Sequence, residues 1–133
     1  RLAAARTFLD GLVRFAADRP VHGECGGYMV LGRALIDADG RSHAMAALLD
    51  VVTSFAKRRM QLGYRRATTL ADGPLGPAGT ALAGHEFHYA TVVETGADEA
   101  FALAGDAYGS TPTPTGGRRG RVSGTFFHVI APA

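Results

Sequence analysis

The chain has 133 residues, and its 14 lysines and arginines against 12 aspartates and glutamates give a formal net charge of +2. Hydrophobic residues make up 47% and charged residues 20%, which is typical of one globular domain and excludes a chain that is disordered throughout. No apolar run reaches the ~18 residues of a membrane-spanning helix, and the single cysteine, Cys25, excludes an internal disulfide. We therefore expect a cytoplasmic domain with no membrane partner, and so weak a charge also argues against a nucleic-acid partner.

The first third of the chain predicts a helix, a strand and a second helix. Residues Leu2 to Asp18 place apolar side chains at helical spacing, and the proline two residues later ends this helix. Val21 to Glu24 then predicts a short strand, and Gly26 to Leu35 predicts a helix that begins directly after Cys25. The sequence Asp-Ala-Asp-Gly at 37–40 predicts a turn.

The remainder of the chain predicts strands separated by glycine-rich loops. Strands are expected at Leu48 to Phe55, Met60 to Leu70, Phe87 to Thr95 and Val122 to Ile130. Gly73 to Pro77 predicts a loop, Gly109 to Gly120 a mobile surface loop, and Ala100 to Tyr108 is ambiguous. A helix, a strand and a sharp turn followed by strands indicate an α/β domain.

The sequence Gly23-Glu24-Cys25-Gly26-Gly27 has the form G-x-C-x-G, the cysteine version of a nucleophile elbow. A nucleophile on a strained strand-to-helix turn needs small neighbours, and Gly23 and Gly27 meet that requirement. A helix that begins after Cys25 favours the thiolate, and the backbone N–H of Gly26 is placed to bind a developing oxyanion. The alternative is a buried structural cysteine in a glycine-rich turn, but the strand and helix on either side favour a catalytic Cys25.

A nucleophilic thiolate needs a base, and five histidines are candidates: His22, His43, His85, His88 and His128. We expect His22 to point away from the tip of the elbow and His43 to be solvated in a polar turn. His128, near the end of the last predicted strand, is the favoured base because a strand beside the nucleophile strand would bring its imidazole to the sulfur. No third residue that would orient this imidazole is evident.

The segment from Gly84 to Tyr89 contains H-E-x-H, one residue short of the H-E-x-x-H zinc motif, so no metal site is predicted. On a strand, Glu86 and His88 share one face. They are candidate supporting residues that either contact a ligand together or pair with each other, and purely structural roles are an equal alternative. The arginine clusters suggest anion recognition, although solvated faces account for most of them.

Four ordered motifs resemble one family: His22 to Gly32, Leu62 to Arg65, Gly84 to Tyr89 and Gly124 to His128. The chain resembles the C-terminal glutamine amidotransferase domain of cobyrinic and hydrogenobyrinic acid a,c-diamide synthases of cobalamin biosynthesis. The resemblance implies a class I glutamine amidotransferase-like α/β fold, a flavodoxin-like sandwich, here truncated at its N-terminal side. It also implies that Cys25 is the nucleophile and His128 the base.

By this resemblance, the substrate is glutamine, and the released ammonia reaches a synthetase domain that amidates the corrin substrate. ATP and Mg²⁺ belong to that domain, which is expected outside this chain, and no cofactor is expected in residues 1–133. A segment that donates the second oxyanion N–H is also expected upstream, so the fragment alone is expected to hydrolyse glutamine poorly. A homodimer is a candidate assembly.

Two alternatives are the related amidotransferase domain of cobyric acid synthase and a catalytically silent interaction fragment. The sequence departs from the wider class in one place. Ile130 stands two residues after His128, where many glutaminases have a glutamate that orients the imidazole. A backbone carbonyl or Glu86 is the expected substitute.

Overall fold

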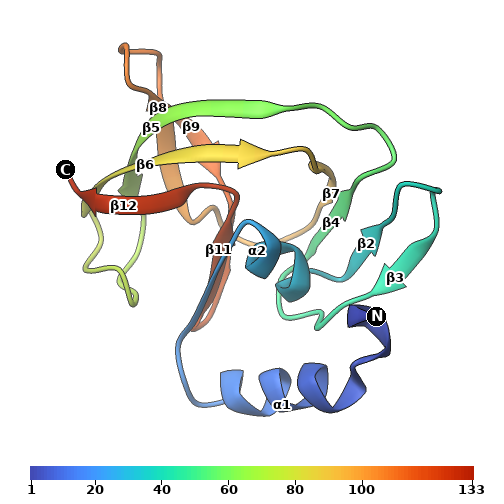
Figure 1. Cartoon of the computed structure of the whole chain (residues 1–133). Coiled ribbons are helices and arrows are strands. Elements are labelled where there is room, and N and C mark those ends of the chain that lie inside the picture. The colour runs from blue at the N-terminus through green and yellow to red at the C-terminus, as the bar shows by residue number, and fades with distance from the viewer.

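Three small β-sheets lie around a short helix in the computed structural model, which describes residues 1–133 (Figure 1). The helices are the 3-10 helix η1 (Leu2–Ala4), α1 (Arg6–Ala16) and α2 (Gly26–Leu31). The first sheet has the order β1 (Val21–Glu24), β11 (Val122–Thr125), β10 (Gly117–Arg119). The second has the order β12 (His128–Pro132), β6 (Ala81–His88), β5 (Gln61–Thr69), β8 (Ala102–Asp106), β9 (Thr113–Thr115). The third has the order β3 (Ser42–Ala44), β2 (Ala34–Ile36), β4 (Val51–Ser54), β7 (Thr91–Thr95).

Two strand pairs are parallel, and one of them carries the predicted nucleophile. β1 pairs with β11 in parallel, with Val21 opposite Val122 and Glu24 opposite Thr125. β2 pairs with β4 in the same sense, and the remaining pairs are antiparallel. Because β1 and β11 run in the same direction, the residues that follow them, Cys25 and Phe126, leave the sheet at the same edge.

The predicted first helix is present as α1, but its apolar face is only partly covered. Leu9 is buried, and Leu12 and Ala16 pack against the adjacent hydrophobic cluster. Phe8 and Phe15 on this face remain 53% and 46% exposed. No helix is long and apolar enough to cross a membrane.

The second helix is shorter than predicted, because α2 ends at Leu31 and Ala34–Ile36 forms β2 instead. At Gly32 the backbone turns to an extended conformation, and an added Cβ there would lie 2.7 Å from the carbonyl oxygen of Val51. The close approach of β4 at this position therefore ends the helix, an effect that the local pattern does not reveal.

Two predicted strands are each divided between different sheets. Phe87 to Thr95 separates into β6 and β7 at Tyr89 and Ala90, and Ala90 is fully buried. Val122 to Ile130 separates into β11 and β12 at Phe126 and Phe127. The predicted loop at 109–120 contains β9 and β10, whereas the ambiguous segment at 100–108 contains β8.

The two adjacent phenylalanines belong to different hydrophobic clusters. Phe126 belongs to the cluster that includes Tyr28 and Leu31 of α2. Phe127 belongs to the cluster that includes Phe101 and Ala67 of the second sheet. Both rings are at least 94% buried, since their exposed fractions are 6% and 1%. The chain thus crosses from one sheet to the next while it fills both clusters, and His128 begins the strand that follows.

We predict that Gly84→Ala destabilises the protein, because Gly84 lies where β6 approaches β12. An added Cβ would overlap the carbonyl oxygen of His128 and lie 2.6 Å from the ring of Phe127. Overpacking of this kind lowers the free energy of unfolding by about 1–3 kcal/mol, which denaturant titration would measure. The matched control is Gly73→Ala, whose added Cβ has no neighbour within 4 Å. Equal stability of the two variants would contradict the prediction.

Candidate active site

Cys25 lies on the strand-to-helix turn that the sequence predicts, between β1 and α2. Its φ is 51° and its ψ is −110°, a conformation that non-glycine residues rarely adopt and that is often found at functional sites. The backbone N–H of Cys25 donates to the carbonyl oxygen of Thr125 at 2.9 Å, and the N–H of Met29 donates to the carbonyl oxygen of Cys25 at 3.1 Å. Hydrogen bonds on both sides therefore hold the strained residue in place.

The glycines around Cys25 have different roles. A Cβ added to Gly23 would lie 2.7 Å from both the backbone of Gly27 and the side chain of Leu31, so β1 and α2 approach each other only because Gly23 lacks a side chain. A Cβ added to Gly27 itself would have no neighbour within 4 Å. The same is true of Gly26, whose surroundings are open beside the thiol. The space next to the predicted oxyanion donor is therefore accessible to a substrate.

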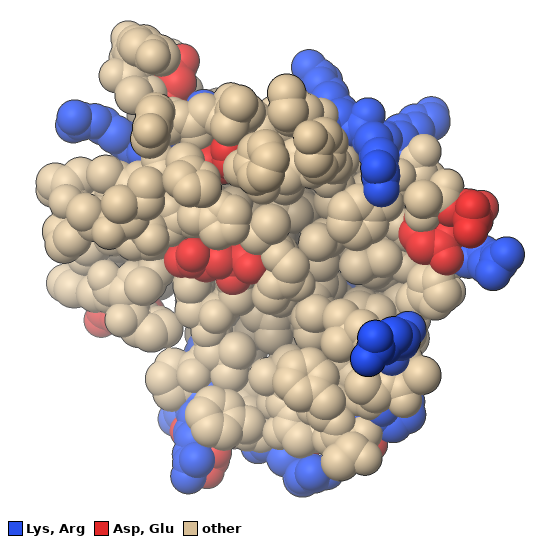
Figure 2. Space-filling model, viewed as in Figure 1, with Lys and Arg blue, Asp and Glu red and all other residues tan.

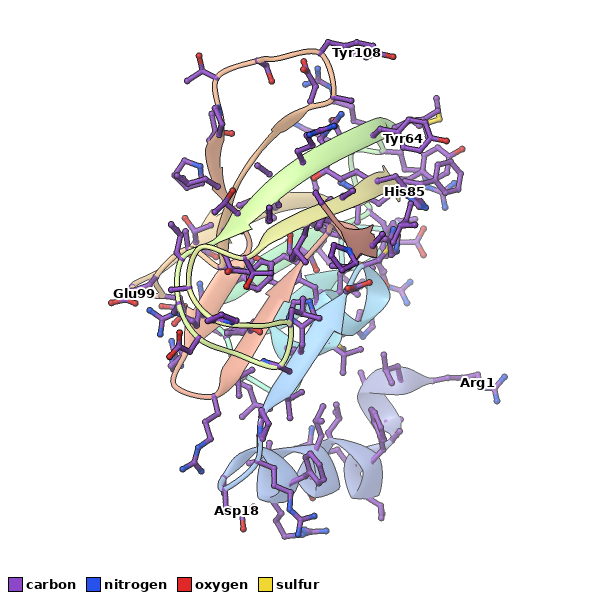
Figure 3. The ribbon with its side chains drawn as sticks, turned by 90° about the vertical axis from the view of Figure 1, so that its left-hand side faces the viewer. Arg1, Asp18, Tyr64, His85, Glu99 and Tyr108 are labelled. Atoms are coloured by element: carbon purple, nitrogen blue, oxygen red, sulfur yellow. The ribbon has the colours of Figure 1, made fainter.

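The thiol of Cys25 is half-buried and lies against the end of β6. Its sulfur is 4.0 Å from the carbonyl oxygen of Phe87. His85, two residues earlier on β6, points to the same face as Phe87 because side chains alternate along a strand. Tyr64 is the cross-strand neighbour of His85 on β5, and Figure 3 shows both at this end of the sheet.

His128 is the first residue of β12 and lies directly opposite His85 on β6. The two imidazole rings are tilted by 59°, with their centroids 5.0 Å apart. Thr125, the last residue of β11, is the partner of Glu24 in the parallel pair, and His128 comes three residues after it. Cys25 directly follows Glu24, so both residues come after the same end of this strand pair. The topology thus brings Cys25, His85 and His128 to one region.

The candidate supporting residues lie on the other face of β6. Glu86 accepts a hydrogen bond from Nε of Arg65 at 3.1 Å, and Nδ1 of His88 lies 2.7 Å from the carbonyl oxygen of Ala90. The ring of His88 stacks on Phe126 at 4.0 Å. The expectation that Glu86 orients His128 is therefore not met, because its carboxylate pairs with Arg65 on the opposite face. Glu86 and His88 do line one cavity of about 260 Å³ together, and they do not pair with each other.

The other two histidines, His22 and His43, make their own contacts with other residues. Nδ1 of His22 is 2.8 Å from Oγ of Ser123, and its buried ring packs against Phe101. Burial lowers the pKa of His22 below its usual value, with an opposing effect from Glu24. His43 is 40% exposed and pairs with Asp37 at 2.7 Å, and this bond lowers the pKa of the Asp37 carboxyl.

The basic clusters lie at residues 57–59, 65–66 and 118–121, and three of their side chains, Arg65, Arg118 and Arg119, pair with carboxylates. Arg118 pairs with Glu99, and Arg119 pairs with Asp98 at 2.7 Å. Figure 2 shows Lys and Arg side chains in several separate groups, with no single basic patch on the face in view. This arrangement favours the interpretation of these clusters as structural and solvated.

Two residues in this region were given no role from the sequence. His85 was only one of five candidate histidines, and its ring faces His128. Glu24 was not a candidate, and its Oε1 accepts a hydrogen bond from the backbone N–H of Val129 at 3.4 Å. Glu24 precedes the nucleophile, and its carboxylate contacts the residue that follows the predicted base. The signal for both lies in the strand register, which pairs residues that are far apart in the sequence.

The whole chain, residues 1–133, matches the CobB/CobQ-like glutamine amidotransferase domain family. It is 60% identical over 131 residues to a hydrogenobyrinate a,c-diamide synthase of Agrobacterium fabrum, and 58% identical over 133 residues to one of Mesorhizobium japonicum. A third, of Rhodobacter capsulatus, is 56% identical over 131 residues. These matches cover 98%, 100% and 98% of this chain, which spans about 30% of the length of each relative.

A solved glutamine amidotransferase structure matches the fold with a TM-score of 0.58 at 17% sequence identity. The match covers 90% of this chain and 58% of that chain. The predicted fold class, α/β and class I glutamine amidotransferase-like, is confirmed.

Proposed function

The chain belongs to the CobB/CobQ-like glutamine amidotransferase family, and on this basis we propose that it is the glutaminase part of an ATP-dependent amidoligase. The reaction we propose for the longer protein converts the a and c carboxylates of hydrogenobyrinic acid to amides, as the names of the similar curated proteins suggest. The observation that carries the proposal is the position of Cys25, strained at an elbow that follows β1, while His128 follows the end of the parallel partner strand β11 by three residues.

In the proposed mechanism, the thiolate of Cys25 attacks the side-chain amide carbon of glutamine. The electron pair of the carbonyl moves to its oxygen, and the N–H of Gly26 stabilises the resulting oxyanion. His128 gives a proton to the leaving nitrogen, so that ammonia departs and a glutamyl thioester remains. His128 then takes a proton from water, whose oxygen attacks the thioester to release glutamate and restore the thiol.

The ammonia is proposed to reach a synthetase part of the longer protein, where ATP and Mg²⁺ are used to activate the corrin carboxylates. The residues of this chain do not fit either group. The chain has no G-x-x-x-x-G-K-[ST] loop, and no group of three or more His, Cys, Asp or Glu side chains is arranged to hold a metal ion. We place the enzyme in the cytoplasm, where a nucleophilic thiol stays reduced.

The proposal is tested on the full-length protein with hydrogenobyrinic acid, ATP, Mg²⁺ and glutamine. The expected result is formation of glutamate together with a corrin diamide, and an electrophilic glutamine analogue is expected to label Cys25 in peptide mass mapping. Amidation at corrin carboxylates other than a and c would favour the cobyric acid synthase reaction instead. Absence of glutamine hydrolysis in an intact protein that amidates with free ammonia would contradict the glutaminase role.

A further inference from the structure

The imidazole of His128 has one ring nitrogen without a partner. Its Nδ1 is buried and makes no hydrogen bond. A buried polar atom without a hydrogen-bond partner lowers the stability of the folded protein and therefore requires an explanation. The side chain two residues later, Ile130, is apolar and 62% exposed, so it offers no carboxylate to this nitrogen. If His128 is the base, its orientation depends on another group.

Glu24 supplies the carboxylate that contacts the strand of His128. Its side chain is 29% exposed, and its Oε1 accepts a hydrogen bond from the backbone N–H of Val129, the residue next to His128, at 3.4 Å. Glu24 is also the last residue of β1 and is bonded covalently to Cys25. One side chain therefore connects the strand that presents the thiol with the strand that presents the imidazole.

The carboxylate of Glu86 does not compete for this role. It belongs to the face of β6 opposite His85, whereas His128 is the cross-strand partner of His85. Its Oε2 is also engaged by Arg65.

We propose that Glu24 is a positioning residue for His128, whose carboxylate fixes the start of β12 and provides a negative charge that faces the imidazolium formed during proton transfer. This inference rests on the proposed glutaminase function. No residue two positions after the histidine is needed, because the carboxylate comes from β1, the parallel partner of the strand that precedes β12.

The charged and titratable groups in this part of the molecule are consistent with this role. His85 of β6 faces His128, and Tyr64 of β5 is opposite His85. Glu24 contacts Val129 and His22, and the thiol of Cys25 lies at the end of β6. Nε2 of His22 lies 3.6 Å from Oε1 of Glu24, but burial lowers the pKa of His22, so this ring is neutral near pH 7. His22 therefore leaves the negative charge of Glu24 uncompensated.

The test is Glu24→Gln in the full-length protein, assayed as glutamine hydrolysis across pH. The amide oxygen of glutamine can still accept the hydrogen bond from Val129, whereas the charge is lost. We expect kcat to fall by about 10-fold or more, short of the ~10²–10⁴ that general acid–base catalysis contributes, with KM little changed. The acid limb of the kcat/KM profile is expected to move to lower pH, because an imidazole without a nearby carboxylate protonates less readily.

Two further variants separate charge from structure. Glu24→Asp keeps the charge but shortens the reach, so we expect a lower kcat with the acid limb at its original position. Glu94→Gln makes the same chemical change at a side chain that is 64% exposed on β7 and pairs with Arg33, and its profile is expected to match that of the unmodified protein.

An unchanged acid limb and kcat in Glu24→Gln would overturn the inference, provided that Cys25→Ser is inactive. Glutamine hydrolysis that persists in Cys25→Ser would instead overturn the proposed function. Thermal unfolding of the same protein preparations, followed by circular dichroism, shows whether each variant is folded like the unmodified protein.

Discussion

Replacing Cys25 by serine in the full-length protein is expected to abolish glutamine-dependent amidation while amidation with added ammonia continues. A serine hydroxyl fits the strained turn, so the elbow is retained, but a hydroxyl is a much weaker acid and nucleophile than a thiol. Loss of a nucleophile removes the covalent route altogether, and we expect glutamine hydrolysis to fall by at least about 10³-fold. Release of glutamate measures the first activity, and corrin amide formed from ammonium salt measures the second.

The ammonia-dependent reaction is the internal control for the Cys25 variant. It passes through the rest of the longer protein and does not use the thiol, so its rate shows that the rest of the protein is intact. Loss of both activities together would mean that the substitution disrupts the structure, and Cys25→Ala would then be tested in the same way. Retention of glutamine hydrolysis would show that Cys25 is not the nucleophile.

Replacing His128 by alanine is expected to have the second largest effect. His128 is the only histidine on β12, and both protonation of the leaving nitrogen and activation of water are assigned to its ring. We expect glutamine hydrolysis to fall by about 10²–10⁴-fold, with ammonia-dependent amidation retained. The release of glutamate under saturating glutamine measures the effect.

His43→Ala is the matched control for the base. His43 pairs with Asp37 at the turn between β2 and β3 and contacts none of the residues at the candidate site. It is expected to leave glutamine hydrolysis unchanged. A His128 variant that is as active as the His43 variant would assign the base to another group, and His85 would be the next residue to replace.

The elbow could be predicted from the sequence because its determinants are local. Gly23, Cys25 and the apolar residues on each side lie within a few positions of one another, and the structure shows the strand, the turn and the helix in that order. The length of the second helix could not be predicted in this way. Its end depends on the contact between Gly32 and Val51, which are 19 positions apart in the sequence.

The candidate site was predictable in part. The motif indicates Cys25 and Gly26. His128 was expected on the strand beside the nucleophile strand, but that strand is β11, and His128 lies three residues beyond its end, on β12 of the second sheet. The contact of Glu24 with Val129 depends on the pairing of strands about 100 residues apart, so no local pattern indicates it. The ion pair of Glu86 could not be predicted for the same reason, because its partner Arg65 lies on β5 and is found only through the register of β5 with β6.

The adjacent residues Phe126 and Phe127 make the position of the proposed base depend on the packing of both hydrophobic clusters. Each ring anchors a different cluster, and His128 follows them directly. If either cluster loses its packing, we expect the start of β12, which carries His128, to lose its position. A partly unfolded form of the domain is then expected not to hydrolyse glutamine. Thermal inactivation of glutamine hydrolysis is therefore expected to coincide with cooperative melting of the domain, without a preceding phase of local fraying.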